Sequence, residues 1–389
     1  MSDFFDEKKP WSRWKHRLLH KYLAQFAGIL GSTHKRVFYV DGFAGAGTYQ
    51  RDKDSVPEDG SPLVAARISA DTVVKGFRHR LHCINIEANK KRFVALQSAT
   101  SSFDPSLITN WRGAFRDHLD AVLQAVGTDP ALFFLDPFGH KGMEWDVVTR
   151  VARRSQTAVT EILQNFYITK IDRDGGWLAN PNKTGIAFIK NLDALFGTDE
   201  WQTRWKAHAN QEARSEALAE LYMTRLCKEF KGIAASHAIR TITGHTKYLL
   251  LFGTSAQRGC RAMSEAVFKV STDYDQERDA YEAAKTQAQA AKKANPNQLT
   301  LDLTVEPAPA TPPSDPDLTI AQELAPAILG ARPSSGSIRF GTLQDRLSVP
   351  LFGRGLEKHY RRACKLLIAQ GKLETNKRAI DDSTTIRFL

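Results

Sequence analysis

The chain has 389 residues, of which 42% are hydrophobic and 25% are charged. That length predicts about two domains, and the composition is that of an ordinary globular chain. The formal net charge of +11 indicates a polyanionic partner such as nucleic acid, although a charge spread along the whole chain also serves solubility alone.

The cysteines and the hydropathy pattern argue against several classes of protein. The chain contains Cys83, Cys227, Cys260 and Cys364. They are far apart and form no CxxC pair, so we expect neither a zinc site nor a disulfide framework, and no bound metal. No segment resembles a membrane span, and the N-terminal residues lack the basic start and apolar core of a signal peptide. We therefore expect a cytoplasmic protein that does not associate with membranes.

Residues 11–30 are predicted to form an amphipathic helix. Its apolar residues recur at steps of three and four and share one face: Trp11, Trp14, Leu18, Tyr22, Phe26 and Ile29. The other face carries Lys15, Arg17, His20 and Lys21. We expect the helix to pack on the edge of a sheet, and the alternative is that it covers a ligand or guides a substrate.

A glycine-rich loop follows the first predicted strand, residues 37–41. Its glycines allow a sharp turn and a close approach of backbone to ligand. The spacing D-G-F-A-G-A-G is not the dinucleotide fingerprint G-x-G-x-x-G, and no P-loop Gly-Lys-Ser/Thr follows. It resembles the first motif of S-adenosylmethionine (SAM) methyltransferases, and the alternative is an ordinary strand-to-helix turn. The resemblance implies cofactor binding by Asp41, Gly42, Phe43, Gly45 and Gly47.

The second predicted strand, residues 80–87, also ends in a carboxylate. Between the two strands, Ser61 and Pro62 predict a helix at 61–71, with the serine as its N-cap. The loop, helix and strand make a βαβ unit. Glu87 is then suited to accept hydrogen bonds from the two hydroxyls of a ribose. The alternative is an exposed acid at a strand end.

The next turn departs from the methyltransferase pattern. We expect a helix at 89–100, a short strand at 107–109 and a helix that ends near Val126. Many SAM enzymes offer a carboxylate to the adenine amino group at this turn. Here Ala114 stands at that position and Asp117 comes later, so the adenine contact is made elsewhere or by backbone.

The fourth predicted strand ends in the second central motif. Its apolar residues, 131–135, lead into Asp136, Pro137, Phe138 and Gly139. The motif resembles the D-P-P-Y of amino-group methyltransferases, and D-P-F-G itself resembles that of tRNA guanosine-N2 dimethyltransferases. A carboxylate and neighbouring carbonyls would accept the hydrogens of a base amine and so free its lone pair. These four residues are the candidate catalytic set, and a strand-ending turn with a structural proline is the alternative.

The remaining elements of this domain are predicted more coarsely. We expect a helix at 144–153, a fifth strand at 157–163 with Asn165 to Tyr167 at its rim, helices at 185–196 and 211–231, and a closing hairpin at 239–252. The segment 170–183 is polar, basic and aromatic. It is interpreted as a mobile substrate loop with Trp177 free to stack on a base, or as a surface loop with a half-buried tryptophan.

The motifs in combination resemble the three-Cys-motif partner protein (TcmP) family, over about residues 10–275. The residues that carry the resemblance are Tyr39 to Gly45, Gly60 to Leu63, Phe134 to Gly139, Tyr248 to Thr254, and Lys21, Tyr22 and Phe26 in the first helix. The resemblance implies a fold similar to SAM methyltransferases and a partner protein that bears a three-cysteine motif.

The C-terminal part is separated by a linker. We expect a helix at 258–271 and a solvated helix at 275–294. Residues 295–316 are rich in proline and alanine, which predicts a stiff, extended linker. The predicted domains are residues 1–274, the linker region 275–316, and 317–389.

The last 73 residues are predicted to form a winged helix-turn-helix. We expect helices at 318–330, 341–347 and 354–370, a short strand at 338–340, and a wing between strands 372–375 and 384–388. The third helix presents five basic residues on one face: Arg354, Lys358, Arg361, Arg362 and Lys365. Such a face suits phosphate contacts with DNA or RNA, and the alternative is a protein-interaction module.

The fold expected is α/β, a Rossmann-like class I methyltransferase sheet followed by a winged helix. Two functions remain open. One is a SAM-dependent methyltransferase that acts on an exocyclic amino group of nucleic acid. The other is a methyltransferase-like, nucleic-acid-binding partner subunit without catalysis.

Overall fold

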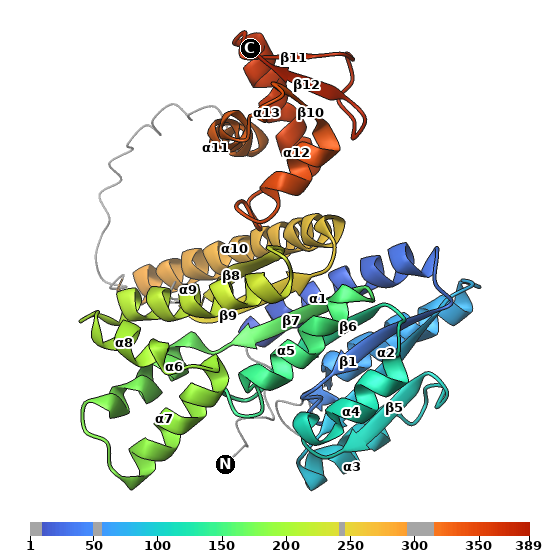
Figure 1. Cartoon of the computed structure of the whole chain (residues 1–389), viewed down its shortest axis with the longest axis vertical. Helices are drawn as coiled ribbons and strands as arrows, with labels where there is room; N and C mark the ends of the chain where they lie inside the picture. Colours follow the sequence, from blue (N-terminus) through green and yellow to red (C-terminus); the bar gives the residue numbers. More distant parts are fainter. Residues whose placement is uncertain (1–9, 50–56, 241–245, 294–314) are drawn as a thin grey trace. The chain divides into compact units, whose positions relative to one another are not determined.

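The computed structural model describes residues 10–49, 57–240, 246–293 and 315–389. The chain divides into two compact units, Met1–Ala266 and Val267–Leu389, each described here by itself (Figure 1). None of the described helices has the length and apolar character needed to cross a membrane. Two expectations concern residues that are wholly or mostly outside the described ranges: the absence of a signal peptide at the N-terminus, and the linker at 295–316.

The first unit is built on a seven-stranded sheet. In spatial order its strands are β5 (Ile108–Arg112), β4 (Arg80–Glu87), β1 (Arg36–Asp41), β6 (Ala131–Leu135), β7 (Thr160–Phe166), β9 (Thr246–Thr254) and β8 (Ala234–Arg240). The first five are parallel, and β9 runs antiparallel to β7 and to β8. This order, with its antiparallel closing hairpin, matches the predicted class I methyltransferase sheet.

Both faces of the sheet are covered, which explains the apolar runs of its central strands. Phe38 and Val40 of β1 pack into the large core with α4 (Phe115–Val126) and α5 (Trp145–Arg153). On the other face, Ser69 of α2 (Ser61–Val74) donates a hydrogen bond to the Leu81 carbonyl of β4. α3 (Lys90–Thr100) connects β4 to β5, and a short 3₁₀ turn, η1 (Arg154–Gln156), precedes β7.

The first helix, α1 (Pro10–Gly31), follows its predicted pattern with two exceptions. Trp14, Leu18, Tyr22 and Phe26 are buried as expected, while Ile29 is 62% exposed. The side chain of Trp11 lies outside the described part. Lys15, which the helical pattern assigns to the polar face, is buried instead. The helix contacts more than one element: the Trp14 ring stacks on His237 of β8, and the Tyr22 hydroxyl bonds to Glu161 of β7.

The start of α2 corrects the predicted cap. Gly60, not Ser61, is the N-cap residue, and no side chain caps the helix. The Ser61 hydroxyl hydrogen-bonds to the buried carboxyl group of Asp41 instead. Ahead of the helix, β2 (Thr48–Tyr49) and β3 (Glu58–Asp59) form a short antiparallel pair that the sequence does not signal.

The segment predicted as a substrate loop is helical. Residues 170–183 contain most of α6 (Ile168–Gly175) and the 3₁₀ turn η2 (Gly176–Leu178). Trp177 is half-buried and stacks on Phe188 at 6.3 Å between ring centroids, as in the alternative of a half-buried tryptophan. The loop interpretation was wrong because Ile168 and Ile171 have a core to pack against. Three helices follow: α7 (Lys183–Phe196), α8 (Glu200–Lys206) and α9 (Gln211–Glu229).

A single long helix, α10 (Gln257–Lys293), replaces the two helices expected at 258–271 and 275–294. The boundary between the compact units falls inside it, between Ala266 and Val267, rather than at residue 274.

The described C-terminal part contains all six expected elements. They are α11 (Pro316–Gly330), β10 (Ser337–Arg339), α12 (Phe340–Leu347), α13 (Glu357–Ala369), β11 (Leu373–Thr375) and β12 (Thr385–Phe388). The strands pair antiparallel in the order β10-β12-β11. They share an apolar core with the helices, in which Leu324, Phe340 and Leu367 are fully or nearly fully buried.

Candidate functional site

A cavity of about 550 Å³ opens at the carboxyl ends of β1, β4, β6 and β7. Its volume lies in the range of small-molecule sites, and its position is where open α/β sheets bind ligands. Eight of the residues predicted to bind cofactor or substrate line it: Gly42, Phe43, Gly45, Glu87, Asp136, Pro137, Phe138 and Gly139. Asp41 and Gly47 are not among the residues that line it.

Asp41 lies beneath the glycine loop and is fully buried. Its carboxylate accepts hydrogen bonds from the Tyr39 hydroxyl at 3.0 Å and from the Phe43 amide at 3.1 Å. Burial raises the pKa of Asp41 to about 6, and the hydrogen bonds from Ser61, Phe43 and Tyr39 oppose that rise. Asp41 therefore shapes the loop from below.

The glycines of the loop play different parts. A Cβ on Gly42 would lie 3.0 Å from Leu135 and 3.1 Å from Phe115, so the backbone there is packed against the sheet and α4. Gly45 has a positive φ of 68° and open space where a Cβ would stand. Gly47 has a φ of 84°, and its carbonyl accepts the Gly60 amide at 2.7 Å. Gly47 thus joins the loop to the start of α2.

Glu87 ties the loop to the second strand. Its Oε2 accepts the Gly45 amide at 2.9 Å and its Oε1 accepts the Asn89 amide at 2.6 Å. The Arg92 guanidinium lies 3.4 Å from Oε1. Oε2 has a second lone pair, so the group retains acceptor capacity.

Asp136 is held by two donors from distant parts of the chain. Lys15 Nζ of α1 lies 2.5 Å from Oδ2, and Asn165 Nδ2 of β7 donates to Oδ1 at 2.8 Å. Lys15 is 5% exposed and Asn165 is 3% exposed, and both line the cavity. Asn165 Oδ1 is buried with no hydrogen-bond partner among the described residues. An unused acceptor thus lies beside the carboxylate.

Two tyrosines form one wall of the cavity next to this ion pair. The rings of Tyr167 and Tyr248 lie 4.5 Å apart at an interplanar angle of 41°. Lys15 Nζ sits 5.2 Å from the centroid of Tyr248, and Lys247 Nζ sits 5.0 Å from that of Tyr167. Both arrangements are cation–π contacts. The wall is therefore aromatic, with a lysine in contact with each ring.

The rest of the D-P-F-G turn lies at the cavity rim. Phe138 is 66% exposed. Gly139 has a φ of 108°, a conformation that side-chain-bearing residues rarely adopt. The backbone conformation therefore requires a glycine at this position, where the D-P-P-Y motif has an aromatic residue.

Ala114 and Asp117, the two residues considered for the adenine contact, both line the cavity. Ala114 is the N-cap residue of α4, and Asp117 follows in the first turn of that helix. Asp117 is exposed, while neighbouring Phe115 is buried and tilts against Phe43. A carboxylate is therefore present at this end of the cavity, three residues after the expected position.

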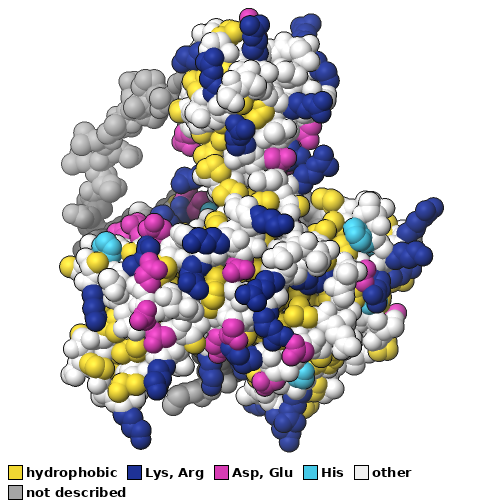
Figure 2. All heavy atoms as spheres, in the orientation of Figure 1, with side chains coloured by type: hydrophobic (Ala, Val, Ile, Leu, Met, Phe, Trp, Pro, Cys, Tyr) yellow, Lys and Arg dark blue, Asp and Glu magenta, His cyan; other side chains and the backbone are white. Residues whose placement is uncertain are grey.

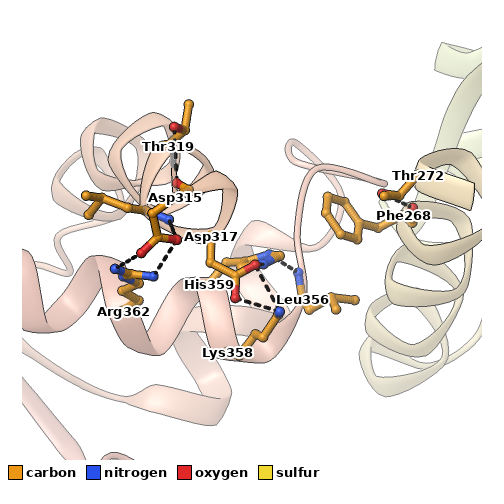
Figure 3. Close-up of polar contacts among 10 residues, drawn as sticks. Phe268, Thr272, Asp315, Asp317, Thr319, Leu356, Lys358, His359 and Arg362 are labelled. Carbon is orange, nitrogen blue, oxygen red and sulfur yellow. Dashed lines mark hydrogen bonds and ion pairs between the residues drawn. The ribbon is translucent and has the colours of Figure 1, made fainter. Parts of the chain in front are cut away.

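The basic face of the C-terminal unit is partly neutralised by acids of its own unit. Lys358 pairs with Asp317 at 2.7 Å and Arg362 with Asp315 at 2.6 Å (Figure 3). Arg361 pairs with Glu357. Lys365 is exposed on α13, whereas Arg354 lies in the turn before that helix and not on it.

Charge elsewhere is dispersed. Lys and Arg side chains are scattered over both units on the face seen in Figure 2, with Asp and Glu between them. Among the described residues no group of three or more His, Cys, Asp or Glu could hold a metal ion.

The sequence patterns did not identify Lys15, Asn165 and Tyr248 together. Asn165 was expected at the rim, but beyond the end of its strand, whereas it is the second-last residue of β7. Lys15 was assigned to a solvated face. The one local signal for a buried Lys15 is its place next to Trp14 in the sequence. That signal does not distinguish a solvated lysine from one that pairs with an acid.

No protein-family model and no curated protein matches the chain. Among solved structures, the O-methyltransferase TomG of Streptomyces achromogenes, in complex with SAM, is 14% identical; the match covers 65% of this chain and 92% of that one, with a TM-score of 0.31. An O-methyltransferase from Bacillus cereus, in complex with SAH, is 13% identical over 60% of this chain and 80% of that one, with a TM-score of 0.30. At these scores the likenesses carry no argument of their own, and the fold class rests on the strand order.

Proposed function

We propose that the chain is a SAM-dependent methyltransferase whose acceptor is a neutral amino group. The observation that carries the proposal is the polar cluster at the cavity wall: Asp136 with its two donors, and the unpartnered buried Asn165 Oδ1 beside it. Acceptors in such a cluster suit a group that donates hydrogens.

The other end of the cavity fits the cofactor. When bound, SAM supplies an activated methyl group. The glycine loop permits a close backbone approach, and Glu87 offers a remaining lone pair of its carboxylate to a ribose hydroxyl. Asp117, which lines the cavity three residues after Ala114, would offer a carboxylate to the adenine. Phe43 and Phe115 contribute apolar surface there.

At the acceptor end the chain orients the amine through hydrogen bonds. Asp136 and Asn165 Oδ1 would each accept a hydrogen bond from one of its N–H groups, which directs the nitrogen lone pair away from the two acceptors. The exposed ring of Phe138 and the Tyr167–Tyr248 wall offer faces for a flat, aromatic acceptor. A nucleobase with an exocyclic amine has both properties.

The central test is Asp136→Ala. We expect methyl transfer to fall by two to four orders of magnitude, the usual contribution of a positioned acid or base, while calorimetric SAM binding remains measurable. The matched control is Asp117→Ala, which should weaken SAM binding and leave the acceptor end intact. Undiminished transfer by Asp136→Ala would remove Asp136 from the mechanism.

We further propose that the acceptor is nucleic acid and that the C-terminal unit is a winged helix that supplies affinity. The net charge and the element order support this. The internal ion pairs of Lys358, Arg361 and Arg362 leave fewer free cations than the sequence indicates. The resemblance to the TcmP family adds a three-Cys-motif protein as partner.

The polymer and the partner are tested together. The protein is incubated with methyl-labelled SAM and a panel of duplex DNA, single-stranded DNA, tRNA and rRNA, each with and without the candidate three-Cys-motif protein. Label in one nucleic acid supports the proposal, and label that needs the second protein supports the partnership. Label only in protein would reject a nucleic-acid acceptor.

A non-catalytic, nucleic-acid-binding subunit is the second candidate. The observation in its favour is that both oxygens of Asp136 already receive donors from the protein itself. SAM binding separates the two candidates, because a scaffold without catalysis has no need of the cofactor. Absence of SAM binding by calorimetry would favour the second candidate.

A further inference from the structure

We propose that Lys15 is a positioning residue of the acceptor site, acting through Asp136. This inference rests on the proposed function and concerns the first helix, which the methyltransferase motifs of the sequence do not include. Lys15 contacts the carboxylate of Asp136, to which we assign binding of the acceptor amine. The D-P-F-G turn alone does not hold that carboxylate in place.

Burial is the first argument. A lysine that is 5% exposed is rare, because removing an ammonium from water costs several kcal/mol unless it is paired. The partner here is Asp136 at 2.5 Å, and the Tyr248 ring adds a cation–π contact. Replacing such a pair with apolar residues is often neutral or stabilising, so its presence at a cavity wall points to a role other than stability.

Rigidity is the second argument. α1 is anchored on both sides of Lys15 in the sequence, by Trp14 stacked on His237 at 5.6 Å and by Tyr22 bonded to Glu161 at 2.6 Å. Lys15 therefore approaches Asp136 from a fixed direction. A donor held in this way selects one orientation of the carboxylate.

The consequence for Asn165 is the third argument. Once Lys15 occupies Oδ2, Oδ1 takes the Asn165 amide nitrogen, and the amide oxygen Oδ1 of Asn165 is then the buried atom without a partner. Lys15 thus sets the direction of two acceptors, one on Asp136 and one on Asn165. An amino group with two hydrogens is the substrate that uses both.

The test compares Lys15→Met, Lys15→Arg and the control Lys21→Met, a lysine on the same helix that does not line the cavity. We expect Lys15→Met to lower kcat by about 100-fold, the cost of misplacing a reacting group by about 1 Å, with an unchanged calorimetric Kd for SAM. Lys15→Arg keeps the charge and should recover part of kcat. Lys21→Met should match the wild type.

A second measurement is independent of turnover. Thermal unfolding of Lys15→Met, Asp136→Asn and the double variant forms a double-mutant cycle. Each single change leaves an unpaired charge, so we expect the double variant to lose less in Tm than the sum of the two. Additive shifts would show that the two side chains do not interact and would overturn the inference.

The outcomes also separate this inference from the proposed function. If the wild-type protein transfers methyl groups and Lys15→Met does so with the same kcat, the role of Lys15 alone is overturned. A wild-type protein that neither binds SAM nor transfers methyl groups overturns the proposed function and this inference with it. A weakened SAM Kd in Lys15→Met would assign the residue to the cofactor and also reject the inference.

Discussion

Two buried carboxyl groups of the first unit differ from ordinary acids. Glu161 accepts hydrogen bonds from the Tyr22 hydroxyl at 2.6 Å and the Thr254 hydroxyl at 2.9 Å, and burial raises its pKa from 4.5 to about 7. Burial likewise raises the pKa of Asp41 to about 6. Both groups join elements that frame the cavity, so their protonation is linked to stability.

The sign of that linkage gives a prediction for Glu161. Its pKa is raised in the folded state, so between about pH 4.5 and about pH 7 the folded chain binds more protons than the unfolded chain. The stabilisation is fully present below that window and is lost as the pH rises through it. Glu161→Gln should flatten the Tm profile across pH 5–7.5, whereas Glu212→Gln, at an exposed position on α9, should leave it unchanged.

Asp41 titrates in part of the same window. Asp41→Asn therefore serves as a second comparison, and the difference between its profile and that of the wild type reports the contribution of Asp41. A variant whose profile runs parallel to that of the wild type over this range would contradict the linkage for the group it removes.

At the scale of elements, the backbone of the glycine loop packs closely against the start of α2. The Gly60 amide donates to the Gly47 carbonyl at 2.7 Å, and a Cβ on Gly60 would lie 2.7 Å from that same oxygen. Because the contacting atoms belong to the backbones of Gly47 and Gly60, they cannot move aside as a flexible side chain does. The β2–β3 pair and the N-terminus of α2 therefore depend on a glycine at position 60.

Gly60→Ala tests this link. We expect a loss of about 1–3 kcal/mol in the free energy of unfolding, typical of overpacking, and weaker SAM binding because the loop must shift. The control is Gly28→Ala in α1, where nothing lies within 4 Å of the added Cβ. There an alanine should stabilise the helix by roughly 0.5–1 kcal/mol. Equal stability of the two variants in urea unfolding would reject the steric argument.

At the scale of the whole molecule, the chain combines a unit built on a methyltransferase-like sheet with a unit in which several cations are paired with acids of the same unit. Asp315 caps α11 through the Leu318 amide at 3.1 Å and also pairs with Arg362. Asp317 accepts from Lys358 and contacts His359 Nε2 at 3.0 Å. These acids compete with phosphate for the cations of α13.

The double variant Asp315→Asn/Asp317→Asn should therefore bind nucleic acid more tightly. Asparagine keeps the N-cap and releases Lys358 and Arg362. With two more phosphate contacts, the slope of log K against log salt should steepen by about 1.8 for duplex DNA. Glu323→Gln, an exposed change on α11, controls for the loss of an acid alone. A titration with unchanged affinity and slope would favour a protein-binding role for this unit.

Much of the architecture was predictable because it follows from local pattern. The strands with Asp41, Glu87 and Asp136 at their ends, the βαβ unit and the closing hairpin are encoded by apolar runs that end in acids and glycines. Two predictions were less accurate. Helix α10 continues through 271–275, and the segment 170–183 is helical because a core covers it.

The positions of the strands along the chain and the acids at their carboxyl ends thus follow from the amino-acid sequence, since each strand carries its own signal. The contacts that define the acceptor end do not. Lys15 and Asp136 are 121 residues apart, and Asn165 comes from a third element. A lysine on a helix is equally compatible with solvent and with a buried acid. Packing of α1 across the sheet brings Lys15 to Asp136, and long-range packing of this kind leaves no local trace.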